Sequence, residues 1–212
     1  MRGDHIAQGI INNVYAGCMK KIIALSLFIL GIFSCHAHGA EMKMKNVLMV
    51  IAENQFRDEE YFQPKKAMEI KGITVRTASG SLNTANGVLG GRVTPDLLIA
   101  DADMKDYDAL VLVGGGGAEQ YYDDPAAHKL IHQAVSREKI IAAICIAPVI
   151  LARAGVLKGK NATVWYSDAG EINNAGGKYT GAKVEKDGNI ITADGPQAVS
   201  GFTDELLAAL LD

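Results

Sequence analysis

The sequence has little excess charge of either sign and few cysteines. Its 21 basic and 24 acidic residues give a net charge of −3 over 212 residues, so it lacks the basic excess that is typical of nucleic-acid-binding proteins. With 49% hydrophobic and 21% charged residues, the composition excludes a disordered, collagen-like or coiled-coil chain as a description of the whole molecule. A globular chain of this length buries a full hydrophobic core, and therefore needs no disulfide to fold.

An apolar stretch near the N-terminus is short for a transmembrane helix. Two lysines at 20 and 21 precede the mainly apolar residues 22–34, whereas a bilayer span takes about 20 residues. A basic start, a short apolar segment and small residues just before position 40 are typical of a secretory signal peptide. We therefore predict that residues 19–39 direct export to a periplasm-like compartment, with cleavage after Gly39.

Other interpretations of this end of the chain stay open. The segment is alternatively an uncleaved membrane tether, which would be the protein's one membrane contact, or a lipoprotein signal that ends at Cys35. Residues 1–18 form an extension of no evident class, and Met19 is an alternative start of translation. We assign residues 40–212 to one folded domain with a single cysteine, Cys145. An exported domain with one cysteine forms no internal disulfide, so this thiol is a candidate reactive group.

Apolar runs alternate with helical patterns along residues 40–212. The patterns predict strands at 46–52, 73–78, 108–113, 139–144 and 161–166, two strands within 183–193, helices at 58–72, 125–138, 146–155 and 203–211, and a loop or hairpin region at 79–91. Pro64 is expected to bend or restart the first helix, and Gly72 to end it. The order of elements predicts an α/β fold, a single doubly wound, flavodoxin-like sandwich with a mostly parallel central sheet and helices on both faces.

Cys145 stands where a predicted buried strand meets a predicted helix. Ala143 and Ala147 flank it at two residues on either side. A strand, a nucleophile between small neighbours and a helix make the pattern of a nucleophile elbow, here with cysteine in place of serine. The positive end of the following helix favours a thiolate. The alternative is a buried structural cysteine.

Two other predicted strand ends carry candidate site residues, and ligands of α/β sheets bind at such ends. The glycines at 114–117 follow a strand and expose backbone N–H groups that are able to stabilise an oxyanion. A phosphate-binding turn is the alternative, although neither G-x-G-x-x-G nor G-K-[ST] is present. Asp58, Glu59 and Glu60 follow the first strand, and one of these carboxylates is a candidate partner of the cysteine. Acidic residues also favour helix N-termini for structural reasons alone.

Together these motifs resemble the ThiJ/PfpI family, in the DJ-one superfamily with the class I glutamine amidotransferase-like fold. The resemblance covers residues 44–211 and rests on F-R-D-E-E-Y-F-Q-P, D-A-L-V-L-V-G-G, A-A-I-C-I-A-P, A-G-V-L-K-G-K and D-G-N-I-I-T-A-D-G-P. It implies that Cys145 is the catalytic cysteine, that Glu60 hydrogen-bonds it, and that the N–H groups of Gly115 and Ile146 form an oxyanion hole. One member of the Cys145–Glu60 pair is then protonated, because adjacent anions repel each other.

The sequence departs from the family pattern directly after the cysteine. Family members called peptidases carry a histidine there, where this chain has Ile146. His128 and His132 lie four residues apart in a predicted helix and share one face. No third metal ligand is evident beside them. We therefore predict a solvated helical face there, with no metal and no organic cofactor.

The resemblance implies three candidate functions. The leading one is a glyoxalase- or deglycase-like enzyme that acts on reactive carbonyls through Cys145 and Glu60. The alternatives are a cysteine peptidase, which lacks a visible histidine base, and a non-enzymatic redox sensor or stress chaperone whose cysteine is oxidised. Gly116, Tyr166 and Asp168 are candidate pocket-lining residues. The expected partners are a small carbonyl compound or a peptide and further copies of the chain in a homo-oligomer, with no nucleic acid.

Overall fold

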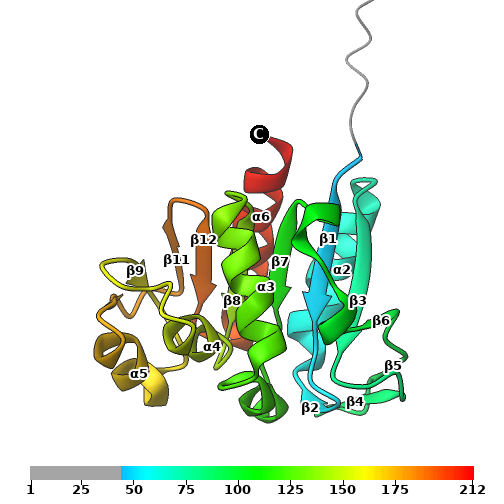
Figure 1. Cartoon of the computed structure of the whole chain (residues 1–212), viewed down its shortest axis with the longest axis horizontal. Helices are drawn as coiled ribbons and strands as arrows, with labels where there is room; N and C mark the ends of the chain where they lie inside the picture. Colours follow the sequence, from blue (N-terminus) through cyan, green and yellow to red (C-terminus); the bar gives the residue numbers. More distant parts are fainter. Residues whose placement is uncertain (1–43) are drawn as a thin grey trace, which may run out of the picture. The chain divides into compact units, whose positions relative to one another are not determined.

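A seven-stranded sheet runs through residues 44–212, the part of the chain that the computed structural model describes (Figure 1). The strand order is β11–β12–β8–β7–β1–β3–β6, and every neighbouring pair is parallel except β11 and β12. The order of β3, β1, β7, β8 and β12 is that of flavodoxin-like folds, which confirms the predicted class. The strands are β1 (Asn46–Val50), β3 (Thr74–Ser79), β6 (Leu97–Leu98), β7 (Ala109–Leu112), β8 (Ile140–Ile144), β11 (Val184–Asp187) and β12 (Ile190–Ala193).

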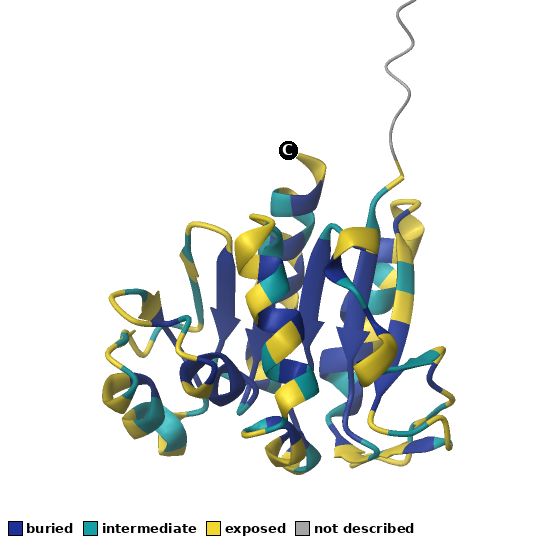
Figure 2. Ribbon diagram, viewed as in Figure 1, coloured by how far each residue is buried: buried dark blue, intermediate teal, exposed yellow. Residues whose placement is uncertain are grey.

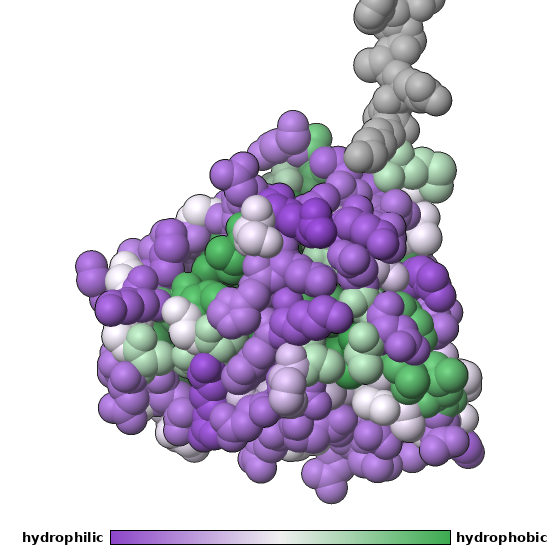
Figure 3. Space-filling view, viewed as in Figure 1, coloured by the Kyte–Doolittle hydropathy of each residue, from purple (hydrophilic) through white to green (hydrophobic). Residues whose placement is uncertain are grey.

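Helices cover both faces of this sheet. α2 (Asp58–Ile70) and α6 (Val199–Leu211) pack together on one face, and α3 (Pro125–Ser136) and α4 (Pro148–Arg153) on the other. Figure 2 shows that the central strands are buried while the outer sides of the helices are exposed. Parallel strands that are covered on both faces read as continuous apolar runs, which is why the sequence pattern predicts them. Figure 3 shows a mainly hydrophilic surface over α3, with apolar patches on either side.

The strand predicted at 161–166 is wrong in length. Only β9 (Asn161–Ala162) forms, and it pairs with the unpredicted β10 (Lys178–Tyr179) in a separate two-stranded sheet. The chain then turns toward the end of β8, because the Trp165 N–H group donates to the Cys145 carbonyl at 2.8 Å. The unpredicted helix α5 (Ala169–Asn174) follows this turn.

The region predicted as a loop or hairpin at 79–91 holds the first strand and the turn of a short antiparallel hairpin. There β4 (Ala85–Gly87) pairs with β2 (Asn54–Phe56) and β5 (Arg92–Val93) in a three-stranded sheet. Such short strands leave no apolar run in the sequence. The 3-10 turns are η1 (Ile99–Asp101), η2 (Met104–Asp106), η3 (Gly116–Tyr121), η4 (Tyr166–Asp168) and η5 (Pro196–Ala198).

The predicted helices need three further corrections. Pro64 does not interrupt α2, which is continuous from Asp58 to Ile70. α4 is shorter than predicted, and α6 begins before the predicted Thr203. Gly72 follows α2 with φ 78°, as expected for a residue that ends a helix.

The predicted N-terminal extension (1–18) and signal-peptide-like segment (19–39) lie outside the described residues. Residues 44–212 include no helix that is both long and apolar enough to span a membrane.

Two helix ends provide a test of backbone strain. Glu138, just after α3, adopts φ 53°, a left-handed conformation that glycine takes at no steric cost. We expect Glu138→Gly to raise the free energy of unfolding by about 0.5 kcal/mol in urea titrations. Gly72→Ala should lower the free energy of unfolding by about the same amount or more, because the φ of Gly72 is also left-handed. The space around Gly72 is open, so the added methyl group meets no clash and the cost is backbone strain alone. An unchanged or lower stability of Glu138→Gly would contradict the strain at this position.

Candidate active site

Cys145 lies in a strained turn between β8 and α4. Its φ of 63° is uncommon for a residue with a side chain. Its N–H group donates to the carbonyl of Ala193 in β12 at 2.9 Å, and its carbonyl accepts from Trp165 N–H. These two bonds hold the turn from both sides. The geometry is that of the predicted nucleophile elbow, with the thiol at the carboxyl end of the sheet.

Glu60 approaches the same point from the first turn of α2. Its side chain is fully buried, and its Oε2 atom accepts a hydrogen bond from Gly114 N–H at 3.1 Å. Within the described residues, Oε1 lacks a hydrogen bond of ordinary geometry. The Cys145 thiol is the side-chain group that faces this carboxyl. The structure therefore brings together the two residues that the sequence motif implied.

The glycines after β7 make this approach possible. A Cβ atom at Gly114 would lie 2.6 Å from Cβ of Cys145 and 2.7 Å from Oε2 of Glu60. At Gly115, which has φ 93°, it would lie 2.3 Å from the carbonyl oxygen of Gln55. All three distances are shorter than van der Waals contact. The absence of side chains at Gly114 and Gly115 thus allows the residues around Gln55, Glu60 and Cys145 to pack directly against the chain that follows β7.

Burial controls the protonation of Glu60. Removal from water raises the pKa of this carboxyl to about 8, although the hydrogen bonds from Gly114 and Cys145 and the charge of Arg57 oppose the shift. A buried carboxyl without enough compensating charge keeps its proton. Glu60 is therefore mainly protonated at neutral pH.

The Cys145 thiol is also mainly protonated at rest. Burial raises its pKa to about 12, and the charge of an ionised Glu60 acts in the same direction. The backbone N–H groups of Gly115 and Ile146 bond to the sulfur and lower the pKa. These are the two groups implied for the oxyanion hole, so the structure places both of them at the reacting atom. A nucleophilic role of Cys145 requires that its proton be transferred, and the ionised form of Glu60, a minority at neutral pH, is the group in position to take it.

Cys145 opens onto a cleft of about 490 Å³. Gly116 and Asp168, both candidates from the sequence, line this cleft. Tyr166, also a candidate, does not line it, since its side chain is 73% exposed. The preceding residue, Trp165, takes the place expected for Tyr166, because successive residues of a 3-10 turn point in different directions.

Sequence reasoning missed other residues of the cleft wall. Gln55 lines the cleft with a strained φ of 58°. Arg57 also lines it, and its guanidinium pairs with Glu59 through contacts of 2.9 and 3.1 Å. Neither residue carries a sequence signal beyond its nearness to the acidic motif. Backbone strain at Gln55 is visible only in the folded chain.

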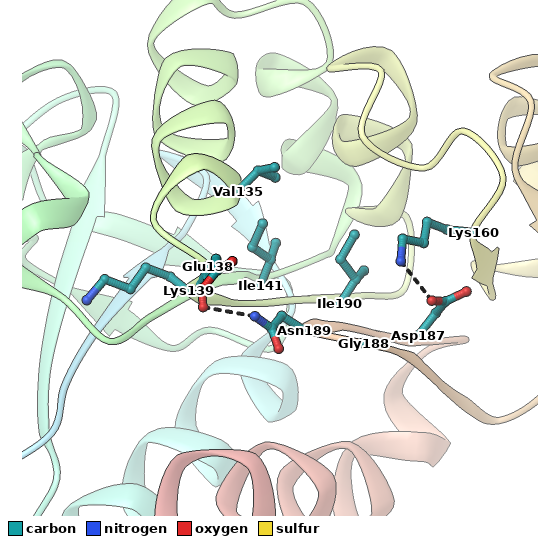
Figure 4. Close-up of a pocket in the computed structure, with 9 residues that line it drawn as sticks. All are labelled: Val135, Glu138, Lys139, Ile141, Lys160, Asp187, Gly188, Asn189 and Ile190. Atoms are coloured by element: carbon teal, nitrogen blue, oxygen red, sulfur yellow. Dashed lines mark hydrogen bonds and ion pairs between the residues drawn. The ribbon is translucent and has the colours of Figure 1, made fainter.

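A second cavity, of about 330 Å³, lies at the opposite ends of β8 and β12 (Figure 4). Figure 4 shows Val135 and Ile141 as part of its apolar lining, and Lys160 paired with Asp187 at 2.9 Å. No nucleophilic thiol and no histidine line this cavity. Because the cleft at Cys145 contains the candidate nucleophile, we assign the candidate active site to that cleft.

The two histidines within residues 44–212 lie away from that cleft. His128 bonds through Nε2 to the carbonyl of Tyr122 at 2.8 Å, and neither it nor His132 lines the cleft. In residues 44–212, no three histidine, cysteine or acidic side chains form a group suited to a metal ion.

Comparison with known proteins identifies the family. The DJ-1/PfpI family matches this chain over residues 45–209. The chain belongs to the DJ-1/PfpI family. A family structure, that of a ThiJ/PfpI domain protein from Brachyspira murdochii, superposes with a TM-score of 0.77 at 34% identity, covering 79% of this chain and 97% of the other.

Family relatives carry the names of two kinds of enzyme. A deglycase from Pyrococcus horikoshii is 30% identical over 163 residues, 77% of this chain and 98% of the relative. A Bacillus subtilis protein named "Putative cysteine protease YraA" is 32% identical over 168 residues, 79% of this chain and 99% of the relative. Membership in the DJ-1/PfpI family is thus compatible with both carbonyl and peptide chemistry, so the site must decide between them.

Glu60 should make stability depend on pH in one direction. Its pKa is about 8 in the folded protein against an ordinary value of 4.5, so the folded state binds this proton more tightly. The resulting stabilisation is complete below about pH 4.5 and is lost as the pH rises through about 8. We expect Glu60→Gln, which is neutral at every pH, to exceed the parent's free energy of unfolding by roughly 4 kcal/mol at about pH 8.

Urea unfolding at about pH 5 and about pH 8 tests this expectation. The advantage of Glu60→Gln should shrink at the lower pH. The control is Asp204→Asn, which removes an exposed carboxyl from α6 and should show no such pH dependence. A difference between Glu60→Gln and the parent that is equal at both pH values would show that Glu60 ionises normally.

Proposed function

We propose that this protein is an enzyme that acts on reactive carbonyl compounds through Cys145 and Glu60. The observation that carries the proposal is a thiol at the base of a cleft, with a protonatable buried carboxyl behind it and two N–H groups at the sulfur. A carboxyl whose pKa lies near the working pH is suited to both accepting and returning a proton. The deglycase activity named for family relatives supports the carbonyl class.

An α-oxoaldehyde such as methylglyoxal illustrates the steps. The sulfur of Cys145 bonds to the aldehyde carbon, and the thiol proton passes to the ionised form of Glu60, which returns it to the carbonyl oxygen to give a hydroxyl group. Glu60, ionised again, then takes the proton of this carbon and delivers it to the neighbouring carbon, while the hydroxyl proton passes to the neighbouring oxygen. The hemithioacetal thereby becomes a thioester of a 2-hydroxy acid. Water hydrolyses the thioester to the acid and restores the thiol. The N–H groups of Gly115 and Ile146 would stabilise the oxyanion in the addition and hydrolysis steps.

Peptide hydrolysis fits this cleft less well. A cysteine peptidase needs a base that ionises the thiol and an acid that protonates the leaving amine, and this role commonly belongs to a histidine beside the cysteine. Ile146 occupies the position after Cys145, and the residues that line the cleft include no histidine. Carbonyl addition requires proton movement over short distances only, which Glu60 alone is placed to perform.

Turnover of methylglyoxal tests the proposed function. We expect the full-length protein, kept reduced, to convert methylglyoxal to lactate in a proton NMR time course. Cys145→Ser removes the attacking sulfur and Glu60→Gln removes the proton carrier, so each should lower kcat/KM by about 100-fold or more. Asp204→Asn should behave as the parent. Lack of turnover by the folded parent, or full turnover by Cys145→Ser, would contradict the proposal.

A further inference from the structure

Beyond the reactive pair, the uncompensated charges of the cleft are all negative. Arg57 is neutralised by its two contacts with Glu59. Glu119 and Asp168 also line the cleft, and within residues 44–212 neither of them forms an ion pair. The hydrogen bond of Asp168 comes from a neutral group, the Ser167 hydroxyl, at 3.4 Å. Two carboxylates therefore face the cleft without a cation.

The surroundings of Asp168 strengthen this conclusion. Partial burial raises its pKa, and the negative charges of Glu119 and Glu171 add to the effect. Arg153 pairs with Asp123 at 2.7 Å and with Glu171 at 3.4 Å, and it is not among the residues that line the cleft. Arg57, which does line the cleft, is paired with Glu59.

An aromatic side chain completes the acidic wall. Trp165 lines the same cleft, half-buried. Its ring is close to Gly195, where a Cβ atom would come within 2.9 Å of the indole. An indole face attracts ammonium and guanidinium groups, and carboxylates bind the same groups through charge and hydrogen bonds. The combination is complementary to a cation.

A separate observation marks the floor of the cleft as the place where a ligand reacts. The Glu60 carboxyl is fully buried, its Oε1 atom lacks an ordinary hydrogen bond, and it faces the thiol that opens into the cleft. A buried carboxyl oxygen without a partner of ordinary geometry other than a reactive thiol calls for an explanation, and a reactive role is one. The cleft thus has a reacting end and a negatively charged end.

We propose that Glu119, Asp168 and Trp165 select substrates in which the carbonyl group is accompanied by a cationic group, an ammonium or a guanidinium. This inference rests on the proposed carbonyl reaction and names its substrate class. The carbonyl lies at Cys145 and the cation lies against the acidic wall. A cleft of about 490 Å³ has the size of a small-molecule site, so one ligand is able to reach both ends.

Charged thiol reagents test the wall without any enzymatic turnover. The reagents are the cationic 2-(trimethylammonio)ethyl, the anionic 2-sulfonatoethyl and the neutral methyl methanethiosulfonates, each of which forms a disulfide with Cys145 and releases methanesulfinate. Rates are measured on the full-length protein from the mass of the Cys145 peptide and divided by the rates with free 2-mercaptoethanol. We expect the cationic reagent to be favoured over the anionic one by about tenfold at low ionic strength, and less at high salt.

Removal of the two carboxylates should abolish this preference. Glu119→Gln combined with Asp168→Asn should lower the ratio of cationic to anionic rates by about tenfold and leave the neutral reagent nearly unaffected. The matched control, Glu185→Gln with Asp204→Asn, removes two carboxylates outside the cleft and should keep the ratio. A ratio near one in the parent, or one that both double variants change equally, would overturn the acidic wall as a selective element.

Two small aldehydes extend the test to the substrate class. Trimethylammonioacetaldehyde is cationic and glyoxylate is anionic, and addition of the thiol to either one protects Cys145 from the neutral reagent. The cationic aldehyde should protect at about tenfold lower concentration, and the wall variant should lose this advantage. Equal protection by both aldehydes would overturn the substrate class. If neither aldehyde protects, the carbonyl reaction itself fails, while the reagent ratios still decide whether the wall selects cations.

Discussion

The buried carboxyl of Glu60 under the Cys145 turn is the constraint on which the rest of the site depends. An ionised carboxylate without water requires strong compensation, and here the hydrogen bond from Gly114 N–H, the Cys145 thiol and the charge of Arg57 compensate only in part. The carboxyl therefore keeps its proton to about pH 8, and the carboxyl and the thiol do not both ionise at low cost because adjacent anions repel each other. In the proposed reaction, Glu60 in its ionised form takes the thiol proton and returns it, which differs from the permanently charged pairs of thiolate and imidazolium that cysteine peptidases use.

The fold supplies this juxtaposition through the topology of the parallel sheet. β1, β7 and β8 are neighbours and end at the same edge, so the residues that follow them meet there. The approach is so close that Gly114 has no room for a side chain. Left-handed backbone at Cys145 and Gln55, two residues of the same cleft, adds strain of a kind that concentrates at functional sites. The buried strands β8 and β12 hold the Cys145 turn, so the rigid core compensates for a locally unfavourable conformation.

Sequence patterns predict the parts of this molecule whose physical cause is local or repeated. Buried parallel strands require apolar runs. The small alanines on either side of Cys145 indicate the sharp turn that this residue occupies. The position of Glu60 follows from the family motif, because spacing alone does not choose among three adjacent acids. The direction of a side chain in a short turn has no such local cause, so Trp165 rather than Tyr166 reaches the cleft. The short strand β9 likewise depends on pairing with the distant β10, which no local pattern encodes.

The charges of the cleft explain how a thiol that is protonated at rest becomes a nucleophile. An ionised Glu60 opposes a thiolate at Cys145. Glu119 and Asp168 add negative charge along the cleft, and Arg57 is already paired. A cationic ligand against the acidic wall neutralises part of this negative field, and an added positive charge lowers the pKa of a nearby thiol. Binding of such a ligand thus favours the ionisation that attack on its carbonyl requires. In the unliganded protein, burial above all raises the pKa of the Cys145 thiol and keeps the sulfur protonated, and a protonated thiol reacts slowly with oxidants and electrophiles. Selection of the substrate and activation of the nucleophile then follow from one electrostatic arrangement.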